Sequence, residues 1–480
     1  MKSIRQIIWA ALLVILDIAV LAVVFKTVWY VRANIFPYYF PEIFQDRRPL
    51  IFVQDYYWVL VYWPILFFYE ELYGRPLTFW EETKRLLKAN TIATLLVVLF
   101  IGLTRAWLIS RSIVILMWLL GIFIFPSARY FFKRMLFRMG LFNRTIVLYG
   151  AGMTGKAVLV GLGKHPELGL DVMGFIDDDP AALHRHVGVY RDRKVDVIGV
   201  AGDFLAGPEA KSVDEIVITI SDITRERLIG IMERCSEVVD RVDFVPDIFG
   251  AAIYTASFEC IDTALVMKFD QNLSKLFPRT VKRAFDIVAS SVLILLLTPV
   301  WLAVFVAIKL DTGGAVLYRQ KRIARGGGVF EIWKYRSMVE NSGPILDAFL
   351  GANPEARAEW DEFRKLKGFD PRVTAVGRFI RKWSIDELPQ LLNVFMGQMS
   401  LVGPRPYLPE EAADMSDYKN IIVKAKPGIT GFWQVSGRNN LSFTDRLRLD
   451  VFYVKNWSFW LDITMLFKTI PVIINKDGAF

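Results

Sequence analysis

The sequence predicts a three-part membrane protein: an α-helical N-terminal module of four transmembrane helices, a Rossmann-like cytoplasmic α/β domain, and a mainly α-helical C-terminal domain with a re-entrant membrane hairpin. Long apolar runs fill the N-terminal part, a strand–glycine loop–helix pattern follows, and a later apolar run has a proline at its centre. These three observations place the domains at 1–143, 144–262 and 282–480, with a linker at 263–281.

The composition places part of the chain in lipid. Of its 480 residues, 54% are hydrophobic, against ~45–50% in a soluble globular protein. The net charge of +9 suits nucleic acid, anionic headgroups or phosphorylated substrates, and the apolar runs favour the last two over nucleic acid. Two cysteines without a CxxC motif argue against a disulfide framework or structural zinc site, and His184 and His186 are expected at the surface.

The N-terminal module is predicted from four apolar runs, Ile7–Phe25, Tyr56–Tyr69, Ala89–Ile109 and Ser112–Phe132. A spanning helix needs ~20 mostly apolar residues, which the first, third and fourth runs supply. The second is weaker because Pro64 lies within it, although its Trp and Tyr content suits an interfacial belt. No cleavage site follows the first run, so it is interpreted as an anchor rather than a signal peptide.

Cationic residues set the expected orientation of this module. They precede the first run, separate the second from the third and follow the fourth, as Lys2, Arg5, Lys84, Arg85, Lys88, Lys133, Arg134, Arg138 and Arg144. The other two loops, Val28–Leu50 and Thr104–Arg111, carry fewer cations and many aromatics. By the positive-inside rule both ends of the module face the cytoplasm. Nothing in the module suggests chemistry, and an anchor role is expected.

The middle domain begins with a buried-strand pattern, Thr145–Tyr149, followed by a GxGxxG loop formed by Gly150, Gly152 and Gly155 and then a helical stretch. Such glycines allow a phosphate to approach a helix N-terminus. Further strands are expected at Val172–Ile176, Glu215–Ile220 and Val242–Val245. This alternation predicts a doubly wound α/β domain.

Ligand binding by this domain stays open. A lone GxGxxG is a weak signal because close strand–helix packing also selects glycine, although an acid in Asp177–Asp179 could bind a ribose hydroxyl. Tyr190 and Lys194 form a YxxxK pattern, but they are expected in a charged loop where dehydrogenase chemistry is not built. A regulatory nucleotide or a purely structural role is therefore favoured over nicotinamide catalysis.

The apolar run Ile287–Ile308 is predicted to be a re-entrant hairpin over about 284–310. As a straight helix it would reach about 33 Å and could cross a bilayer. Thr298 and Pro299 break it at the centre, where proline removes a backbone hydrogen bond. Both flanks are cationic, which places both ends on the cytoplasmic face. An ordinary kinked spanning helix remains the alternative.

The densest charged cluster near an apolar segment is Arg378–Gln390, RFIRKWSIDELPQ. Ser384 and Glu387 have the spacing of a capping box, and the helix dipole favours acids in a first turn. Pro389 would fit better in a helix capped by Asp386 than in one capped by Ser384. Local physics alone leaves helix capping and catalysis equally open for the acidic pair.

Two further loops favour catalysis. The segment SLVGPRP presents Arg405 from a stiff turn, and KPGITG is followed by GRNN, which contains Arg438. Rigid loops that present single guanidinium groups suit bidentate recognition of phosphate. Each could be a plain surface turn, but several in one small domain beside paired carboxylates make a phosphate site the preferred interpretation.

From Lys282 to Phe480 the chain resembles the monotopic bacterial phosphoglycosyl transferases, and the whole chain resembles their long form, the undecaprenyl-phosphate galactose phosphotransferases. The matching pieces are KRAFD, YRQKRI, IWKYRSM, IRKWSIDELPQLLNVFMGQMSLVGPRP, KPGITGFWQVSGRN and LDVFYVKNWS. Departures are the glycine-rich IARGGGVF, Trp383 in place of a small polar residue, and Thr298 where serine is frequent. None removes an expected catalytic group.

The resemblance implies roles for individual residues. Asp386 would attack the β-phosphorus of a UDP-sugar, releasing UMP, and Glu387 would hold Mg²⁺. Undecaprenyl phosphate would then take the sugar phosphate, with galactose the implied hexose. A carboxylate can approach a diphosphate when a metal and arginines offset their repulsion. The residues expected to contact substrate are Arg336, Arg381, Arg405 and Arg438, together with Lys334 and Asp450.

The resemblance also implies a place in the cell: the bacterial inner membrane, with the catalytic domain on the cytoplasmic face, at the first membrane step of O-antigen, capsule or exopolysaccharide assembly. Contact with membrane lipids and a symmetric homodimer are further expectations. Two other readings stay open, a membrane-bound NAD-dependent enzyme that modifies nucleotide sugars through the middle domain, and a non-catalytic scaffold for polysaccharide export.

Overall fold

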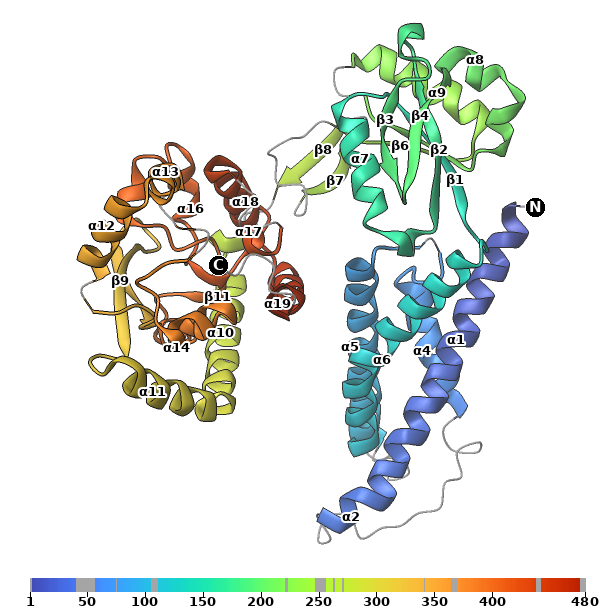
Figure 1. Ribbon diagram of the computed structural model, residues 1–480. Coiled ribbons are helices and arrows are strands. Elements are labelled where there is room, and N and C mark those ends of the chain that lie inside the picture. The colour runs from blue at the N-terminus through green and yellow to red at the C-terminus, as the bar shows by residue number, and fades with distance from the viewer. Residues whose placement is uncertain are drawn as a thin grey trace. The chain divides into compact units, whose positions relative to one another are not determined.

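The computed structural model divides into two compact units, Met1–Asp247 and Ile248–Phe480. It describes residues 2–39, 57–74, 76–104, 111–220, 223–246, 256–261, 264–269, 272–340, 342–363, 366, 369–436 and 442–474. Figure 1 shows long helices and an α/β sheet in the first unit, and mostly helices in the second. The three kinds of structure therefore occur in the predicted order.

Among the described residues, the longer helices of the first unit's helical module are α1 (Lys2–Tyr30), α4 (Tyr57–Tyr69), α5 (Phe79–Thr104) and α6 (Arg111–Arg138). Helix α1 continues through a π-helical turn, Val31–Ile35, into α2 (Phe36–Tyr39). Within the described parts of the chain, α1 with its extension, α5 and α6 are each long and apolar enough to cross a membrane. Helix α4 has 13 residues, so its length alone does not make it a full span.

A buried ionic cluster that was not predicted from the sequence joins α1, α5 and α6. Arg129 Nη2 lies 2.5 Å from Asp17 Oδ2, and its Nη1 lies 3.2 Å from Glu82 Oε1. Lys133 Nζ lies 2.5 Å from Glu82 Oε2, and Tyr73 donates to Asp17. Two acids and two bases balance here, as buried charges require.

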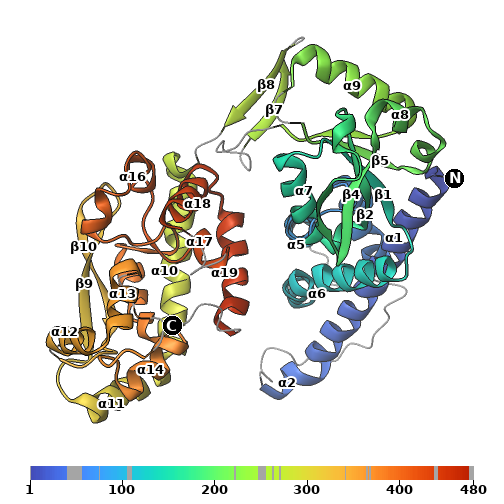
Figure 2. The ribbon, with the colours of Figure 1, turned by 45° about the horizontal axis from the view of Figure 1, so that its top comes forward.

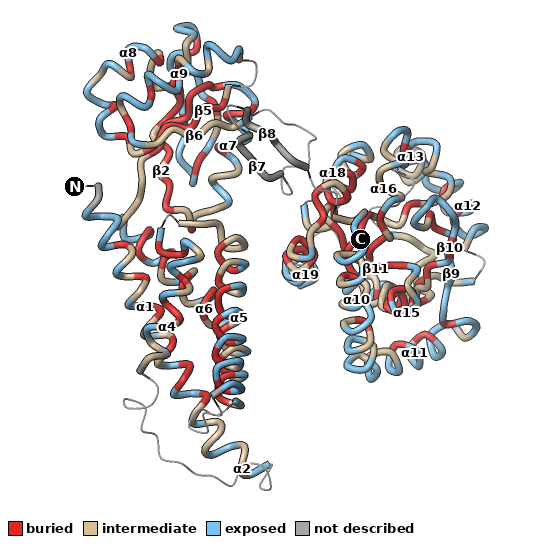
Figure 3. Tube along the Cα trace, turned by 180° about the vertical axis from the view of Figure 1, so that it is seen from behind, coloured by how far each residue is buried: buried red, intermediate tan, exposed pale blue. Residues whose placement is uncertain are grey.

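This cluster corrects the assignment of several cations to loops. Helices α5 and α6 extend beyond the apolar runs, so the residues assigned to the cytoplasmic loops, Lys84, Arg85, Lys88, Lys133, Arg134 and Arg138, lie within them. The side chain of Lys133 is 1% exposed, because Glu82 draws it into the bundle. Figure 3 shows buried positions along the mutually packed sides of the helices and exposed positions on the opposite sides.

The α/β domain is a six-stranded sheet in the order β3-β4-β2-β1-β5-β6. Its strands are β1 (Arg144–Tyr149), β2 (Leu170–Asp177), β3 (His186–Tyr190), β4 (Arg193–Val200), β5 (Glu215–Ile218) and β6 (Val242–Phe244). Every pairing is parallel except β3 with β4. Helix α7 (Met153–Gly163) packs into one core, and α8 (Ala201–Ala206) and α9 (Arg225–Val238) pack into another. Two cores of this kind are expected of a doubly wound fold.

The β3–β4 hairpin replaces the charged loop expected around Tyr190 and Lys194. The Tyr190 side chain is buried in β3, and its hydroxyl donates to the carbonyl oxygen of Leu170 at 2.5 Å. Charged residues occupy most of the exposed positions of this hairpin, so its sequence resembles a charged loop more than a pair of strands. Tyr190 is thus a core residue, which is consistent with a YxxxK pattern that has no catalytic role.

The second unit begins with an antiparallel hairpin, β7 (Ala256–Ile261) and β8 (Ala264–Phe269). It continues with α10 (Leu276–Leu296) and α11 (Thr298–Thr312), which are bent relative to each other by 60°. Strand β8 and the first turns of α10 therefore occupy much of the range 263–281 that was predicted as a linker. The bend coincides with the predicted break at Thr298 and Pro299.

Two short sheets and many helices complete this unit. The ribbon of β9 (Leu317–Ile323) and β10 (Val329–Tyr335) is antiparallel (Figure 2), and β11 (Ser400–Val402) pairs with β12 (Gly428–Thr430). The helices are α12 (Ser342–Ala352), α13 (Pro354–Phe363), α14 (Ala375–Lys382), α15 (Gln390–Met396), α16 (Tyr418–Ile422), α17 (Phe432–Val435), α18 (Phe443–Lys455) and α19 (Phe459–Ile474).

A shared core fixes α10 to this unit. Residues of β10, α15, β11, α18 and α19 form one apolar cluster, against which Phe285 of α10 packs. Lys282 is buried, and its Nζ lies 2.5 Å from Asp462 Oδ2. The same ammonium donates to the carbonyl oxygen of Val402 at 3.0 Å. Lys282, one of the cations predicted to flank the apolar run, is therefore buried in an ion pair with Asp462 and is largely shielded from solvent.

Candidate active site

The acidic pair occupies a single 3₁₀ turn, Ile385–Glu387, between α14 and α15. Ser384 precedes the turn with φ of 54°, a left-handed conformation that is uncommon outside glycine. Its side chain makes no capping hydrogen bond, and α15 begins only at Gln390 after Pro389. Neither capping alternative is therefore present, and a strained residue of this kind is often found at functional sites.

Glu387 is held by a cation from the neighbouring ribbon. Lys334 lies on β10, and its Nζ is 2.8 Å from Glu387 Oε1. Both side chains are partly exposed, so the pair faces the surface on one side. The two residues are 53 positions apart, and the packing of β10 against the acidic turn brings them together.

Asp386 lies between opposing electrostatic influences. Burial, and then the negative charge of Glu387, raise the pKa of its carboxyl to about 6. The positive charges of Lys334 and Arg381 oppose that rise. Arg381 sits in the last turn of α14 and is fixed by a 2.8 Å bond from its Nε to Ser337 Oγ. The predicted residues Lys334 and Arg381 thus flank the acidic pair.

A second cationic group surrounds Trp433. The guanidinium carbon of Arg405 lies 5.1 Å from the indole centroid, and that of Arg446 lies 5.8 Å from it. The Arg405 backbone amide donates to Asp450 Oδ2 at 3.0 Å, and the Tyr407 hydroxyl donates to the same oxygen at 2.8 Å. Asp450 is fully buried, so it positions the Arg405 loop instead of contacting a substrate directly.

Arg322 was missed by the sequence analysis and links the two groups. It is 8% exposed, and its Nη1 donates to the carbonyl oxygen of Pro406 at 2.8 Å. Burial lowers its pKa, the charge of Arg405 lowers it further, and the charge of Glu387 opposes that change. Arg322 lies in the motif YRQKRI, and this position could have identified it as a candidate site residue. Arg446 lies outside every quoted motif, so no local pattern pointed to it.

Two predicted phosphate contacts are not part of this arrangement as described. Arg336 binds Glu340 at 2.5 Å and Thr312 at 2.7 Å, and it also bonds the carbonyl oxygen of Gly313. These bonds tie it to the end of α11, and none of its described bonds reaches the acidic pair. Arg438 lies outside the described residues.

The donor set around the acidic pair suits Mg²⁺ completed by a substrate. Among the residues that the structure describes, no group of three or more His, Cys, Asp or Glu side chains could enclose a metal. Mg²⁺ usually binds one or two carboxylates together with waters and substrate phosphates. Asp386 and Glu387, adjacent on one turn, supply such a pair, and their mutual repulsion favours a cation beside them.

Two of the three glycines in the loop of the α/β domain pack closely against their neighbours. A Cβ on Gly155 would lie 2.3 Å from the Gly150 carbonyl oxygen, so close packing requires glycine there. The Ala151 amide, which faces this loop, donates to Asp177 Oδ2 at 2.9 Å. Asp178 accepts from Tyr149 and pairs with Arg227 at 2.7 Å. Packing accounts for Gly150 and Gly155, whereas a Cβ on Gly152 would meet nothing within 4 Å. Whether Gly150, Gly152 and Gly155 bind a nucleotide stays a prediction.

Two family models match the chain. The model described as "Bacterial sugar transferase" matches residues 277–476, which include the acidic turn and both cationic groups. The model described as "CoA-binding domain" matches residues 66–246, which include the α/β sheet. The first match covers most of the second compact unit, and the second lies within the first unit.

Relatives whose names give a substrate match over most of their length. An undecaprenyl-phosphate galactose phosphotransferase of Salmonella typhimurium is 34% identical over 85% of this chain and 84% of its own. A UDP-galactose-lipid carrier transferase of Erwinia amylovora is 36% identical over 85% and 84%. A UDP-glucose:undecaprenyl-phosphate glucose-1-phosphate transferase of Klebsiella pneumoniae is 30% identical over 71% and 70%.

Proposed function

This chain belongs to the bacterial sugar transferase family, and on that premise we propose that it transfers hexose-1-phosphate, with galactose as the hexose, from a UDP-sugar to undecaprenyl phosphate, with release of UMP. It is a membrane-associated transferase of polysaccharide synthesis. The observation that carries the proposal is the Asp386–Glu387 turn, flanked by Lys334 and Arg381 inside the family match. Galactose follows the names of the two relatives that match over the greater length.

In the first step an oxygen of the Asp386 carboxylate attacks the β-phosphorus of the UDP-sugar. The bond from that phosphorus to the bridging oxygen breaks, UMP leaves with the bridging oxygen, and a sugar-phosphoryl aspartate forms. The Arg381 and Arg405 guanidiniums offset the repulsion between the carboxylate and the diphosphate. Lys334 orients Glu387 through their ion pair.

In the second step an oxygen of undecaprenyl phosphate attacks the same phosphorus. The acyl phosphate bond breaks, Asp386 recovers its carboxylate, and the sugar is joined to the lipid through a diphosphate. Dividing the transfer in this way keeps two anionic substrates from having to react directly with each other.

We propose that Glu387, with Asp386 beside it, holds Mg²⁺. When bound, the ion neutralises the negative charge of the diphosphate. The support is the chemistry of the donor set, two adjacent carboxylates on a partly exposed turn.

We further propose that α10 and α11 form a re-entrant hairpin. The 60° bend falls where Thr298 Oγ1 donates back to the Ile294 carbonyl oxygen at 2.9 Å and Pro299 offers no amide. Leu295, Leu296 and Leu302 near the bend are exposed, as lipid contacts should be. Cations flank both limbs, which supports an inner-membrane protein whose catalytic domain, residues 282–480, faces the cytoplasm.

The two domains that precede the catalytic domain have supporting roles in this proposal. Residues 1–143 would anchor the chain as a four-helix module, and residues 144–262 would form a cytoplasmic accessory domain. The alternative of a nicotinamide-dependent enzyme has no support from the site, because the acids after β2 are engaged within the domain.

The test is a product assay with the full-length protein, undecaprenyl phosphate and Mg²⁺. UDP-galactose and UDP-glucose are offered separately, UMP is quantified, and the lipid product is identified by mass. We expect UMP and a lipid diphosphate hexose, formed faster from UDP-galactose, and neither product from the Asp386→Asn variant. A faster reaction with UDP-glucose would correct the hexose. Oxidation or reduction of a nicotinamide without UMP release would contradict the proposed reaction.

A further inference from the structure

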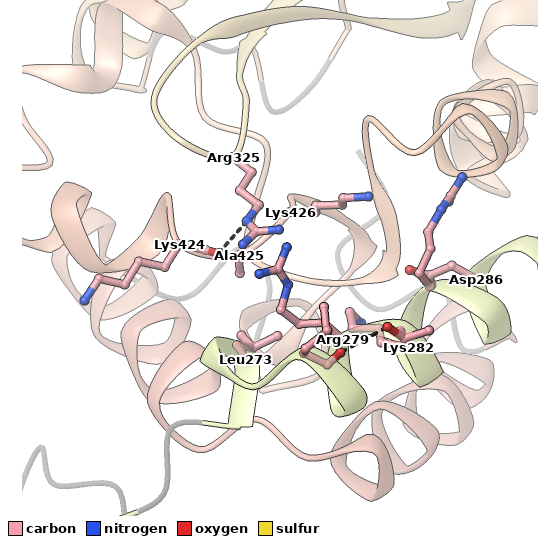
Figure 4. Close-up of a pocket in the computed structure, with 11 residues that line it drawn as sticks. Leu273, Arg279, Lys282, Asp286, Arg325, Lys424, Ala425 and Lys426 are labelled. Atoms are coloured by element: carbon pink, nitrogen blue, oxygen red, sulfur yellow. Dashed lines mark hydrogen bonds between the residues drawn. The ribbon is translucent and has the colours of Figure 1, made fainter.

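A cationic pocket lies at the beginning of α10, away from the acidic turn. Its cavity volume is about 260 Å³. The lining comes from the first turns of α10, the loop after β9 and the segment after α16, and it comprises Leu273, Leu276, Arg279, Thr280, Lys282, Arg283, Asp286, Arg325, Lys424, Ala425 and Lys426. Figure 4 shows Arg279 and Arg325 turned toward each other, whereas the side chain of Lys424 points away.

The charges in this pocket are unbalanced. Lys282 pairs with Asp462. Asp286 accepts from the Ser400 hydroxyl and the Leu401 amide, which are neutral donors, so its negative charge remains and opposes the lowering of the Lys426 pKa. This single carboxylate faces five further cations. The other cations are Arg279, Arg283, Arg325, Lys424 and Lys426. Within the described parts of the chain none of these five forms an ion pair. An anion is therefore the missing partner that the local charge favours.

Two of these arginines are fixed by the main chain. Arg283 donates from Nη1 to the Val394 carbonyl oxygen and from Nη2 to that of Phe395, each at 2.7 Å. Arg325 donates from Nε to the Lys424 carbonyl oxygen at 3.0 Å. Fixed guanidinium groups lose less freedom when they bind a phosphate than free side chains do.

A glycine allows the cations to approach each other. Gly397 ends α15 with φ of +89°, and a Cβ there would lie 3.0 Å from Arg283 Nη2 and 3.5 Å from Lys426 Nζ. The positive charges of Arg283 and Lys426 therefore lie close together. Burial and then the charge of Arg283 lower the pKa of Lys426, and burial and then the charge of Arg279 lower the pKa of Arg325. A bound anion would offset the like-charge repulsion that contributes to both pKa changes.

The pocket and the acidic turn lie at opposite ends of α15. Asp386 precedes the first residue of this helix, and Arg283 binds the carbonyl groups at its last turn. A helix of this length spans about 10 Å. A sugar phosphate held at Asp386 would therefore leave the pocket free.

We propose that this pocket is a second phosphate-binding site, which takes a phosphate monoester or diester that does not take part in the transfer. The inference goes beyond the proposed reaction, which requires no phosphate here. Two sources share this chemistry. One is the headgroup of an anionic phospholipid, favoured by the exposed apolar side chains of Leu276 and Phe277 beside the cations. The other is a soluble phosphate.

The test uses the full-length protein in nanodiscs, without UDP-sugar, so that its outcome is independent of the transfer reaction. The pocket variant combines Arg325→Gln and Lys426→Gln. The matched control combines Arg448→Gln and Lys321→Gln, two exposed cations of the same unit outside the pocket. One arm measures retention of phosphatidylglycerol by native mass spectrometry. The other titrates inorganic phosphate into protein in phosphatidylethanolamine nanodiscs.

We expect the wild type and the control to bind alike and the pocket variant to bind at least about 10-fold more weakly, because charge-assisted hydrogen bonds are lost. Retention of phosphatidylglycerol would identify a lipid headgroup as the source. Binding of inorganic phosphate alone would identify a soluble phosphate. The inference is overturned if neither ligand binds the wild type, or if the pocket variant and the control lose affinity equally. Thermal unfolding of both variants shows whether each is folded.

Discussion

Asp386 and Glu387 are neighbours in the chain, and their carboxylates share a turn that the surrounding chain partly buries. Like charges in such a place repel each other unless cations compensate. Lys334 binds Glu387 directly, and Arg381 acts on Asp386 through its charge. The arrangement keeps both acids close to groups that would also neutralise a diphosphate.

Asp450 shows how a buried acid can serve the site without touching substrate. Its Oδ2 accepts from the Arg405 amide and the Tyr407 hydroxyl, while its Oδ1 is buried with no hydrogen-bond partner among the described residues. Burial raises its pKa to about 7. The folded state therefore holds a proton that the unfolded chain releases near pH 4.

Replacement of Asp450 by Asn should change how stability depends on pH. The raised pKa contributes stability below about pH 4, and this contribution is lost as pH rises through about 7. The variant has no such loss, so between pH 5 and pH 8 its unfolding free energy should gain on the wild type by roughly 3 kcal/mol, because about two pH units of the loss fall in this range. Thermal unfolding in detergent across this pH range measures the difference. Asp414→Asn, an exposed acid, is the control, and parallel curves for Asp450→Asn and wild type would contradict the assignment.

The residues of the site were only partly predictable from sequence. The acids were found because the DE dipeptide lies in a recognisable motif, yet local rules could not separate catalysis from capping. The left-handed Ser384 and the start of α15 at Gln390 exclude the capping alternative, and both depend on tertiary packing. Arg446 reaches Trp433 across an intervening segment, which no spacing rule reveals.

Among the elements, the bend between α10 and α11 depends on a short break. Helix α10 ends at Leu296 and α11 begins at Thr298, so a single residue, Leu297, separates them. Proline within a helix costs ~3 kcal/mol or more in water. Removing the break should therefore favour a straighter helix, long enough to cross the bilayer.

The double variant Thr298→Val with Pro299→Leu should move part of the population to a spanning topology. A cysteine at exposed Glu355 reports the side on which the catalytic domain lies, through labelling of intact cells with an impermeant maleimide. The Glu355→Cys parent should stay unlabelled, and the double variant should be labelled in part. Labelling of the parent would contradict a cytoplasmic catalytic domain. Absence of labelling in both would show that the bend is set by other residues.

Other elements show which kinds of secondary structure the sequence pattern predicted and which it did not. The parallel strands β1, β2 and β5 were predicted because they are continuous apolar runs bounded by turns. The hairpins β3–β4 and β7–β8 were missed. Strands β3 and β4 mix charged and apolar positions over few residues, and β7 and β8 are six residues each, in a range predicted as a domain end and a linker. Helices α5 and α6 extend beyond their apolar runs because a buried ionic cluster satisfies Glu82 and Lys133.

At the scale of the whole molecule, every described residue of the candidate site belongs to the second compact unit. The family match for sugar transferases also lies within that unit. The transfer reaction should therefore need no residue of the helical module or the α/β domain.

A chain of residues 248–480, expressed alone in membranes, should release UMP from the UDP-sugar at a rate comparable to that of the full-length protein. The unit keeps its own core and the bent pair of apolar helices α10 and α11. Residues 1–247 alone should release none. If the shorter chain is folded in membranes by thermal unfolding but inactive, the first unit contributes directly to the site.

In the proposed reaction Asp386 carries the sugar phosphate between the two substrates. The most direct measurement is intact-protein and peptide mass analysis after incubation with UDP-hexose and Mg²⁺ in the absence of undecaprenyl phosphate. We expect UMP release up to one equivalent and a hexose-phosphate adduct on the peptide that contains Asp386, with neither in the Asp386→Asn variant. UMP release that requires undecaprenyl phosphate and leaves no adduct, or release at a normal rate from that variant, would contradict the account.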